Sequence, residues 1–138
     1  MRMVATLLRP GDDLREAIEK FVAEQKISAG TIISCVAALS HARLRMAGTA
    51  RDVQDIKEFE GKFEVVSLAG NVGQNRTHLH MAISDKDGNV YGGHVKTGGN
   101  IIAITAELVI AVEDRLRFSE KHDPSVGWDN LVIEKAHD

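Results

Sequence analysis

The sequence predicts an α+β fold, in which one main helix packs on a mostly antiparallel sheet of about seven strands. The first observation is a single amphipathic helical pattern near the N-terminus. The second is that short β-type segments fill the rest of the chain, and the third is that most connections between them are too brief for parallel crossovers. Because 138 residues suit one hydrophobic core, we expect a single domain over residues 1–138.

The helix is expected to begin after Asp13, a residue type that caps helix N-termini. Glu16 stands three residues later, in the spacing of a capping box. A strand over residues 2–8 precedes the helix and ends where proline and glycine follow. The apolar residues of the helix recur at the spacing of one face, which we expect to contact the sheet: Leu14, Ala17, Ile18, Phe21 and Val22.

The β-type pattern begins near Gly30 and continues to the end of the chain. Residues 31–36 are apolar on both faces, as in a central strand, and the next residues alternate, with His41, Arg43 and Arg45 on one face. The glycine-containing segments 70–75 and 97–100 are interpreted as loops or turns between strands. Further strands are expected at residues 56–60, 63–72, 77–84, 90–96, 101–112, 115–118 and 131–134.

Composition and charge exclude several classes of protein. The net charge of −3 gives no general attraction for nucleic acid, and aromatic residues, at 4%, offer few platforms for base stacking. The longest apolar stretch, 101–112, falls well short of the roughly 20 residues that span a bilayer, so we expect no membrane segment. The N-terminus does not resemble a signal peptide, and the lone Cys35 forms no intramolecular disulfide, so we expect a cytoplasmic protein.

The strongest chemical signal is a set of three histidines on two neighbouring β-type segments. His78 and His80 are two residues apart, so on a strand they project from the same face. His94 follows on the next segment. Opposed residues on paired strands have Cβ atoms about 4.5–5.5 Å apart, which lets imidazoles meet at one ion. A lone histidine on a strand is usually a polar surface residue, and it is the third histidine that favours a metal site.

Whether the third histidine joins the pair depends on the turn around residues 86–88. A three-residue loop with a left-handed glycine places His94 directly opposite His80. A two-residue turn instead places His94 opposite Met81, on the wrong face of the sheet. The sequence leaves both registers open.

Three neutral imidazoles with an open fourth position fit Zn²⁺ best, while Ni²⁺, Cu²⁺ and Fe²⁺ accept the same ligand type. An open position also suggests a small zinc-dependent hydrolase, in which bound water is the nucleophile. Glu64, Asp85 and Glu107 are candidate general bases, but no pattern marks any of them as catalytic. The chain lacks a G-x-S-x-G motif and Cys35 lies in an apolar run, where we expect an inert thiol, so no nucleophile is identified.

Five motifs occur together across nearly the whole chain: residues 8–14 (L-R-P-G-D-D-L), 61–70 (G-K-F-E-V-V-S-L-A-G), 78–80 (H-L-H), 92–94 (G-G-H) and 127–131 (G-W-D-N-L). In this combination they resemble the PPC domain, the plants and prokaryotes conserved domain. The resemblance implies a homotrimer with sheet faces buried between subunits, and a metal held by the histidine trio of prokaryotic members. In plants the domain accompanies AT-hooks in DNA-associated nuclear proteins, whereas this chain lacks the R-G-R-P core of that motif.

We therefore expect a cytoplasmic, homotrimeric binding or regulatory module whose metal, zinc by ligand type, is held by His78, His80 and His94. Its ligand is not identified by the sequence. A DNA-associated regulatory protein, as in the plant relatives, and a small zinc-dependent hydrolase are the alternatives.

Overall fold

The computed structural model describes residues 1–48 and 50–136, and within them the chain forms one helix and eight strands. The predicted sheet-dominated fold with a single helix is confirmed, although eight strands in two sheets replace the expected seven or so. The elements are β1 (Arg2–Leu8), α1 (Leu14–Glu24), β2 (Gly30–Arg45), β3 (Ile56–Gly73), β4 (Arg76–Ser84), β5 (Val90–Val95), β6 (Ile102–Val112), β7 (Leu116–Asp123) and β8 (Trp128–Lys135).

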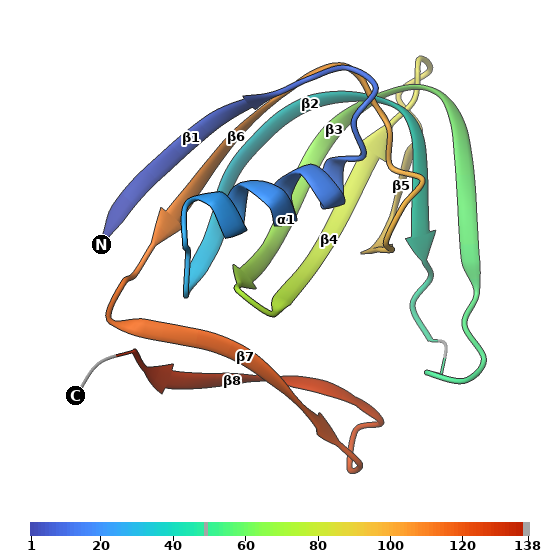
Figure 1. The fold of residues 1–138 in the computed structure, drawn as a ribbon. Helices are drawn as coiled ribbons and strands as arrows, with labels where there is room; N and C mark the ends of the chain where they lie inside the picture. The colour runs from blue at the N-terminus through green and yellow to red at the C-terminus, as the bar shows by residue number, and fades with distance from the viewer. Residues whose placement is uncertain (49, 137–138) are drawn as a thin grey trace.

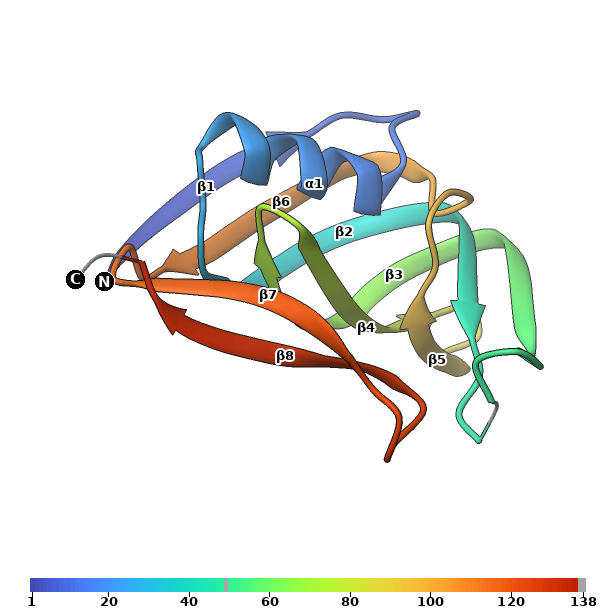
Figure 2. The same ribbon diagram turned by 60° about the horizontal axis from the view of Figure 1, so that its bottom comes forward.

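Six of the strands form one curved sheet in the order β1-β6-β2-β3-β4-β5, with antiparallel pairing throughout. The edge strand β5 also turns back to pair with β2, through Leu44 with Val95 and Arg45 with His94. Figure 1 shows this sheet arching over α1. β7 and β8 form a separate hairpin, and β7 lies against β3 and β4, as Figure 2 shows.

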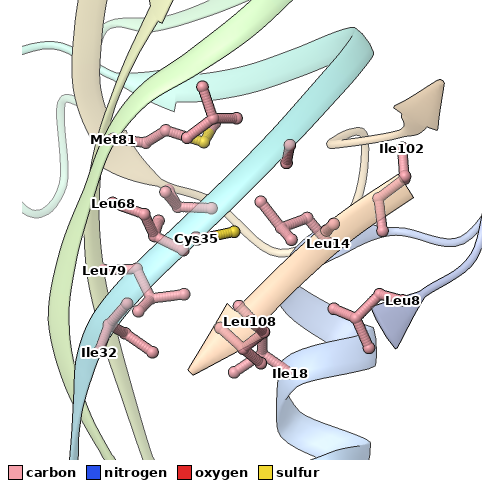
Figure 3. Packing of buried hydrophobic residues seen from close by; sticks show 14 of the residues in the cluster. Leu8, Leu14, Ile18, Ile32, Cys35, Leu68, Leu79, Met81, Ile102 and Leu108 are labelled. Carbon is pink, nitrogen blue, oxygen red and sulfur yellow. The ribbon is translucent and has the colours of Figure 1, made fainter. Parts of the chain in front are cut away.

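The helix begins where the sequence predicts. Asp13 is its N-cap, and the Asp13 Oδ2 atom accepts a hydrogen bond from the backbone N–H of Glu16 at 2.9 Å. Leu14, Ile18 and Val22 form the buried stripe that holds α1 on the sheet. In Figure 3 the stripe meets side chains of β1 and β6: Leu8, Ile102 and Leu108.

Among the described residues, no helix has both the length and the apolar character to cross a membrane.

β3 is longer than the sequence predicts, because the segments expected at 56–60 and 63–72 form one strand. The loop expected at 70–75 is correspondingly reduced to a turn at residues 74 and 75. Gly70 serves a close contact instead of a turn, since a Cβ atom there would lie 2.0 Å from the backbone carbonyl oxygen of His78. This glycine therefore lets β3 approach β4 beside the first histidine.

β7 and β8 are also longer than the strands expected at 115–118 and 131–134. None of the residues of these two strands is fully buried. A strand without a buried face does not need the regular alternation of apolar and polar residues that marks a half-buried strand, and this sequence lacks it. Polar residues such as Glu120 and Lys121 continue the strand without that signal.

β2 is a central strand of the sheet, as predicted, but only one of its faces is buried within the chain. Ile33 and Val36 are 55% and 60% exposed. Val66 of β3 and Ile104 of β6, on the two adjacent strands, are exposed as well. We call these four residues the outer apolar face. The expectation that both faces of residues 31–36 are covered therefore does not hold within a single chain.

The covered side of β2 includes Cys35, which Figure 3 shows among the core side chains. Burial raises the pKa of its thiol to about 11. The predicted position of Cys35 in the apolar core is confirmed, and a raised pKa makes the reactive thiolate scarce at neutral pH.

Asn100 is fully buried and connects three parts of the fold. Its side-chain oxygen accepts a hydrogen bond from the backbone N–H of Arg43 on β2 at 2.9 Å. Its side-chain nitrogen donates to the carbonyl oxygens of Lys96 and Gly98, at 2.8 and 3.2 Å. Its backbone N–H donates to the helix cap, Asp13, at 2.7 Å. One residue thus links β2, the segment after β5 and the start of α1.

Replacing Asn100 with alanine would leave the backbone N–H of Arg43 without its acceptor. Because an unsatisfied buried polar group costs about 1–3 kcal/mol, we expect Asn100→Ala to lower the free energy of unfolding by about 2–4 kcal/mol. Urea unfolding followed by circular dichroism measures the change. The matched control is Asn75→Ala in the exposed β3–β4 turn. Equal losses in the two variants would show that the Asn100 contacts do not support the fold.

Candidate metal site

The β4–β5 hairpin carries the three histidines, and Asp85 shapes its turn. The Asp85 Oδ1 atom accepts hydrogen bonds from the backbone N–H groups of Asp87 and Asn89, both at 2.9 Å. The backbone N–H of Asp85 donates to the carbonyl oxygen of Asn89 at 2.9 Å, and Gly88 has a φ of 82°. The turn is therefore the three-residue loop with a left-handed glycine.

This turn sets the register in which His80 lies directly opposite His94. The rival register is wrong, because Met81 lies opposite a glycine. His78 projects from the same face as His80, and Leu79 between them is fully buried on the other face. The predicted alternation along this strand is confirmed.

The three imidazole rings converge. The centroid of the His78 ring lies 4.9 Å from that of His80 and 5.1 Å from that of His94, and the last two are 5.7 Å apart. One nitrogen of each ring lies within 4.8 Å of the chosen nitrogens of the others. Zinc–nitrogen bonds of about 2.0–2.1 Å place tetrahedral ligands about 3.3 Å apart, a separation that modest side-chain rotations reach. Their role as metal ligands stays a prediction.

His94 gives the clearest indication that this group fits a cation. Its Nδ1 atom is buried and has no hydrogen-bond partner within the described part of the chain. Such orphaned polar atoms are uncommon in folded proteins, and an ion at this position would supply the missing partner.

The surroundings of His78 and His94 favour the neutral form of both rings. Burial, followed by the positive charge of Arg45, lowers the pKa of His94 to about 3. Burial, followed by the neighbouring His80 and then Arg76, also lowers the pKa of His78. A neutral imidazole offers the lone pair that a metal ion requires.

Gly93 positions the third histidine. A Cβ atom at residue 93 would lie 2.5 Å from the backbone carbonyl oxygen of Arg45, so a larger residue there would push β5 away from β2. The close approach places His94 between Arg45 on one neighbouring strand and His80 on the other.

Arg76 contacts the trio and is only 5% exposed. Its Nη2 atom donates a hydrogen bond to the Nδ1 atom of His78 at 3.1 Å. Because a guanidinium only donates, His78 accepts here, and Arg76 competes with a metal ion for this ring. Arg76 also donates to Asn71 Oδ1 at 2.6 Å and to Glu120 Oε2 at 3.0 Å, so two acceptors remain for it when His78 turns towards an ion.

A cavity of about 620 Å³ opens beside His78 and His80, and the β7–β8 hairpin supplies part of its wall. The guanidinium carbon of Arg45 lies 4.1 Å from the centroid of the Trp128 ring on this hairpin, a cation–π contact. Two ion pairs join the hairpin to the rest of the chain: Arg51 with Asp129 at 3.1 Å, and Arg76 with Glu120 at 3.0 Å.

Most of this lining is not evident in the sequence. The position of Arg76 beside the histidines could be predicted, because it precedes His78 by two residues on the same strand and therefore projects from the same face. Nothing in the local sequence connects residues 120–130 with the histidines, because their contact depends on where the hairpin folds back. The predicted motif at residues 127–131 contains Trp128 without indicating what the ring contacts.

The carboxylates considered as general bases do not line this cavity. The Asp85 carboxylate accepts hydrogen bonds within the hairpin turn. Glu64 lies opposite Ser84, near the other end of β4, and Glu107 lies on β6. The carboxylates that do line the cavity, Glu120 and Asp129, are paired with arginines. Within the described residues, both carboxylates that line the cavity are thus engaged in ion pairs.

The basic stripe of His41, Arg43 and Arg45 lies on one face of β2, as predicted. Two of its members face carboxylates: His41 lies 3.7 Å from Glu60, and Arg43 lies 3.5 Å from Glu58. The stripe is therefore not a continuous positive surface.

The curved antiparallel sheet, the single helix and the histidine-lined cavity together define an α+β protein with a candidate metal site on one hairpin. The chain belongs to the Plants and Prokaryotes Conserved (PCC) domain family, whose model matches residues 1–114. The resemblance drawn from the sequence motifs is thereby confirmed. The matched region ends before β7, so the hairpin that borders the cavity lies outside it.

Two curated relatives are much longer than this chain. The bifunctional protein GlmU of Synechococcus sp. (strain JA-3-3Ab) is 36% identical over 136 residues, which are 99% of this chain and 21% of that protein. AT-hook motif nuclear-localized protein 8 of Arabidopsis thaliana is 32% identical over 108 residues, covering 72% of this chain and 26% of that protein. The chain thus spans about a fifth to a quarter of these relatives.

Solved structures share the fold over nearly their whole length. A hypothetical protein from Salmonella enterica is 34% identical with a TM-score of 0.89, and the match covers 97% of this chain and 94% of that one. A metal-containing protein from Archaeoglobus fulgidus is 26% identical with a TM-score of 0.78, covering 96% of this chain and 94% of that one.

We expect the metal-free protein to lose stability as the pH falls from 7 to 5. His78 and His94 have lowered pKa values in the folded state, whereas histidines of the unfolded chain titrate near 6.5. The unfolded chain therefore binds more protons in this interval, and acidification favours unfolding. Urea midpoints in the presence of EDTA at the two pH values measure the loss. His94→Gln should lose less stability between them, and an equal loss would contradict the assignment.

Proposed function

We propose that this protein is a homotrimeric metal-binding module of the PCC family, acting as one domain over residues 1–138 in binding or regulation. The observation that carries the proposal is the convergence of His78, His80 and His94, one of which has a buried ring nitrogen, His94 Nδ1, with no partner among the described residues. Three neutral imidazoles suit Zn²⁺, and Ni²⁺, Cu²⁺ and Fe²⁺ accept the same donors. When bound, the ion supplies a Lewis acid with a position open to a further ligand.

A relative supports this proposal. The Archaeoglobus fulgidus protein, at 26% identity, is described by its name as metal-containing. The absence of an unpaired carboxylate around the cavity, among the residues described, favours a module that binds a ligand over a zinc-dependent hydrolase. We propose a cytoplasmic location, since a lone free cysteine such as Cys35 suits a reducing compartment.

Elemental analysis of protein purified without a histidine tag tests the metal site. We expect about one zinc or other divalent ion per chain, and a fall of at least tenfold in His80→Ala, because two imidazoles hold an ion far more weakly than three. His41→Ala is the matched control, since His41 is exposed on β2 and outside the trio. Equal metal content in His80→Ala and His41→Ala would refute the ligand role.

The outer apolar face supports the homotrimer. Ile33, Val36, Val66 and Ile104 lie on three adjacent strands of the sheet and are all more than half exposed. Exposed apolar side chains on neighbouring strands favour a contact with another chain, because their burial is favourable by about 25 cal/mol per Å².

Size-exclusion chromatography with light scattering tests the assembly. We expect a mass near 45 kDa, three times the 15.1 kDa chain, and a shift towards 15 kDa in Val36→Asp, since a charge buried in the contact is costly. Val53→Asp is the control, because Val53 is 71% exposed in the segment between β2 and β3. A monomeric parent protein, or equal masses for the two variants, would overturn this part of the proposal.

DNA association is the second candidate, and it is favoured by the name of the Arabidopsis relative, an AT-hook motif nuclear-localized protein. The R-G-R-P core of the AT-hook does not occur in this chain. The net charge is −3, and the stripe on β2 is partly paired with glutamates. We therefore place DNA association behind the metal-binding module.

A further inference from the structure

The cavity beside the histidines has a surplus of positive charge. Four cations line it, Arg45, Arg51, Arg76 and Lys96, against two carboxylates, Glu120 and Asp129. The carboxylates pair with Arg51 and Arg76. Among the residues described, Arg45 and Lys96 have no carboxylate within ion-pair distance, although the chain as a whole is acidic. The lining of the cavity is therefore positively charged, whereas the chain as a whole carries a negative net charge.

Both unpaired cations lie next to the third histidine. Arg45 is the neighbour of His94 across the β2–β5 pairing, and Lys96 follows His94 by two residues. The protein holds both cations in place with uncharged partners. The Arg45 guanidinium lies over the ring of Trp128, and the Nζ atom of Lys96 donates to the side-chain oxygen of Gln54 at 3.2 Å.

Such an arrangement suits an oxyanion. A guanidinium that stacks by its flat face keeps its N–H edge free for the two oxygens of a carboxylate or phosphate group. A half-buried cation is stabilised when an anion compensates its charge. Arg45 is partly buried, and its guanidinium carbon lies over the Trp128 ring at 4.1 Å from the centroid, a position compatible with this arrangement.

We infer that the cavity binds a small molecule through a carboxylate or phosphate group placed between Arg45, Lys96 and the two histidines that line it, His78 and His80. This inference rests on the proposed function insofar as a metal ion at the trio adds positive charge to the same cavity. The residues of the hairpin complete the site, since Trp128 and Val126 offer apolar surface to the rest of the ligand.

The dimensions favour a small molecule over a nucleic acid. A volume of about 620 Å³ lies within the range of about 300–1,000 Å³ that is usual for small-ligand sites. DNA binding instead relies on phosphate contacts spread along a basic surface. Beyond the cavity on β2, Arg43 and His41 face Glu58 and Glu60, so the positive surface does not continue in that direction.

Fluorescence of Trp128, the sole tryptophan of the chain, reports binding directly. EDTA-treated protein is titrated with inorganic phosphate and, separately, with succinate, at an ionic strength held constant with sodium chloride. We expect saturable binding of at least one probe, and the tighter of the two identifies the group that the cavity prefers. Calorimetry repeats the titrations, because changing Arg45 also alters the surroundings of Trp128.

The variants are Arg45→Gln and Lys96→Gln, with Lys20→Gln as the control for loss of one positive charge on the exposed side of α1. We expect affinity to fall at least tenfold in the first two and to stay unchanged in the control. The absence of saturable binding, or equal affinities in all three variants, would overturn the inference. A duplex oligonucleotide that binds more tightly than either probe, with a steep salt dependence, would overturn it in favour of DNA.

Zinc content measured on the same proteins before EDTA treatment separates this inference from the proposed function. Binding that is lost in Arg45→Gln while no metal is found in the parent protein would leave the anion site standing and remove the metal site. Metal bound at the trio, with no affinity for either probe in the metal-free or the zinc-loaded protein, would remove the anion site alone.

Discussion

The register of the β4–β5 hairpin is the constraint on which the histidine site depends. Asp85 sets it by accepting four hydrogen bonds, two from backbone N–H groups and two from the side chains of Asn89 and Tyr91. Because strand residues alternate between faces, a slip of one residue would turn His94 towards the core. The loop fixes His94 opposite His80 before any ion is involved.

Three separate parts of the chain then complete the site around this hairpin. β2 closes on β5, and the missing side chain of Gly93 lets Arg45 lie beside His94. The start of β4 provides Arg76, which ties His78 to Glu120 on β7. The β7–β8 hairpin brings Trp128 over Arg45. The cavity is therefore a product of tertiary contacts, whereas the trio is a product of one local turn.

This difference explains how far the sequence alone predicts the molecule. The cap at Asp13 and the helix stripe follow from spacings within a few residues, and the structure confirms them. The sequence offers the His80–His94 pairing as one of two registers, and the structure selects it. The continuity of β3 through Gly61 and Lys62 is not predicted, because a glycine between two strand-like segments resembles a turn residue. Gly70 likewise serves a close contact with β4 instead of a turn. The exposed face of β2 and the lining of the cavity are not predicted either. The type of a residue, apolar or charged, does not indicate which other segment or which other chain packs against it.

The β7–β8 hairpin begins after the family match has ended at residue 114, whereas all three histidines lie before that point. The proposed metal ligands thus lie inside the matched region, whereas the hairpin adds one part of the cavity wall, through residues such as Val126 and Trp128. A change in the hairpin would reshape that part of the wall. At Glu120 it would also reach His78, because Arg76 contacts both residues.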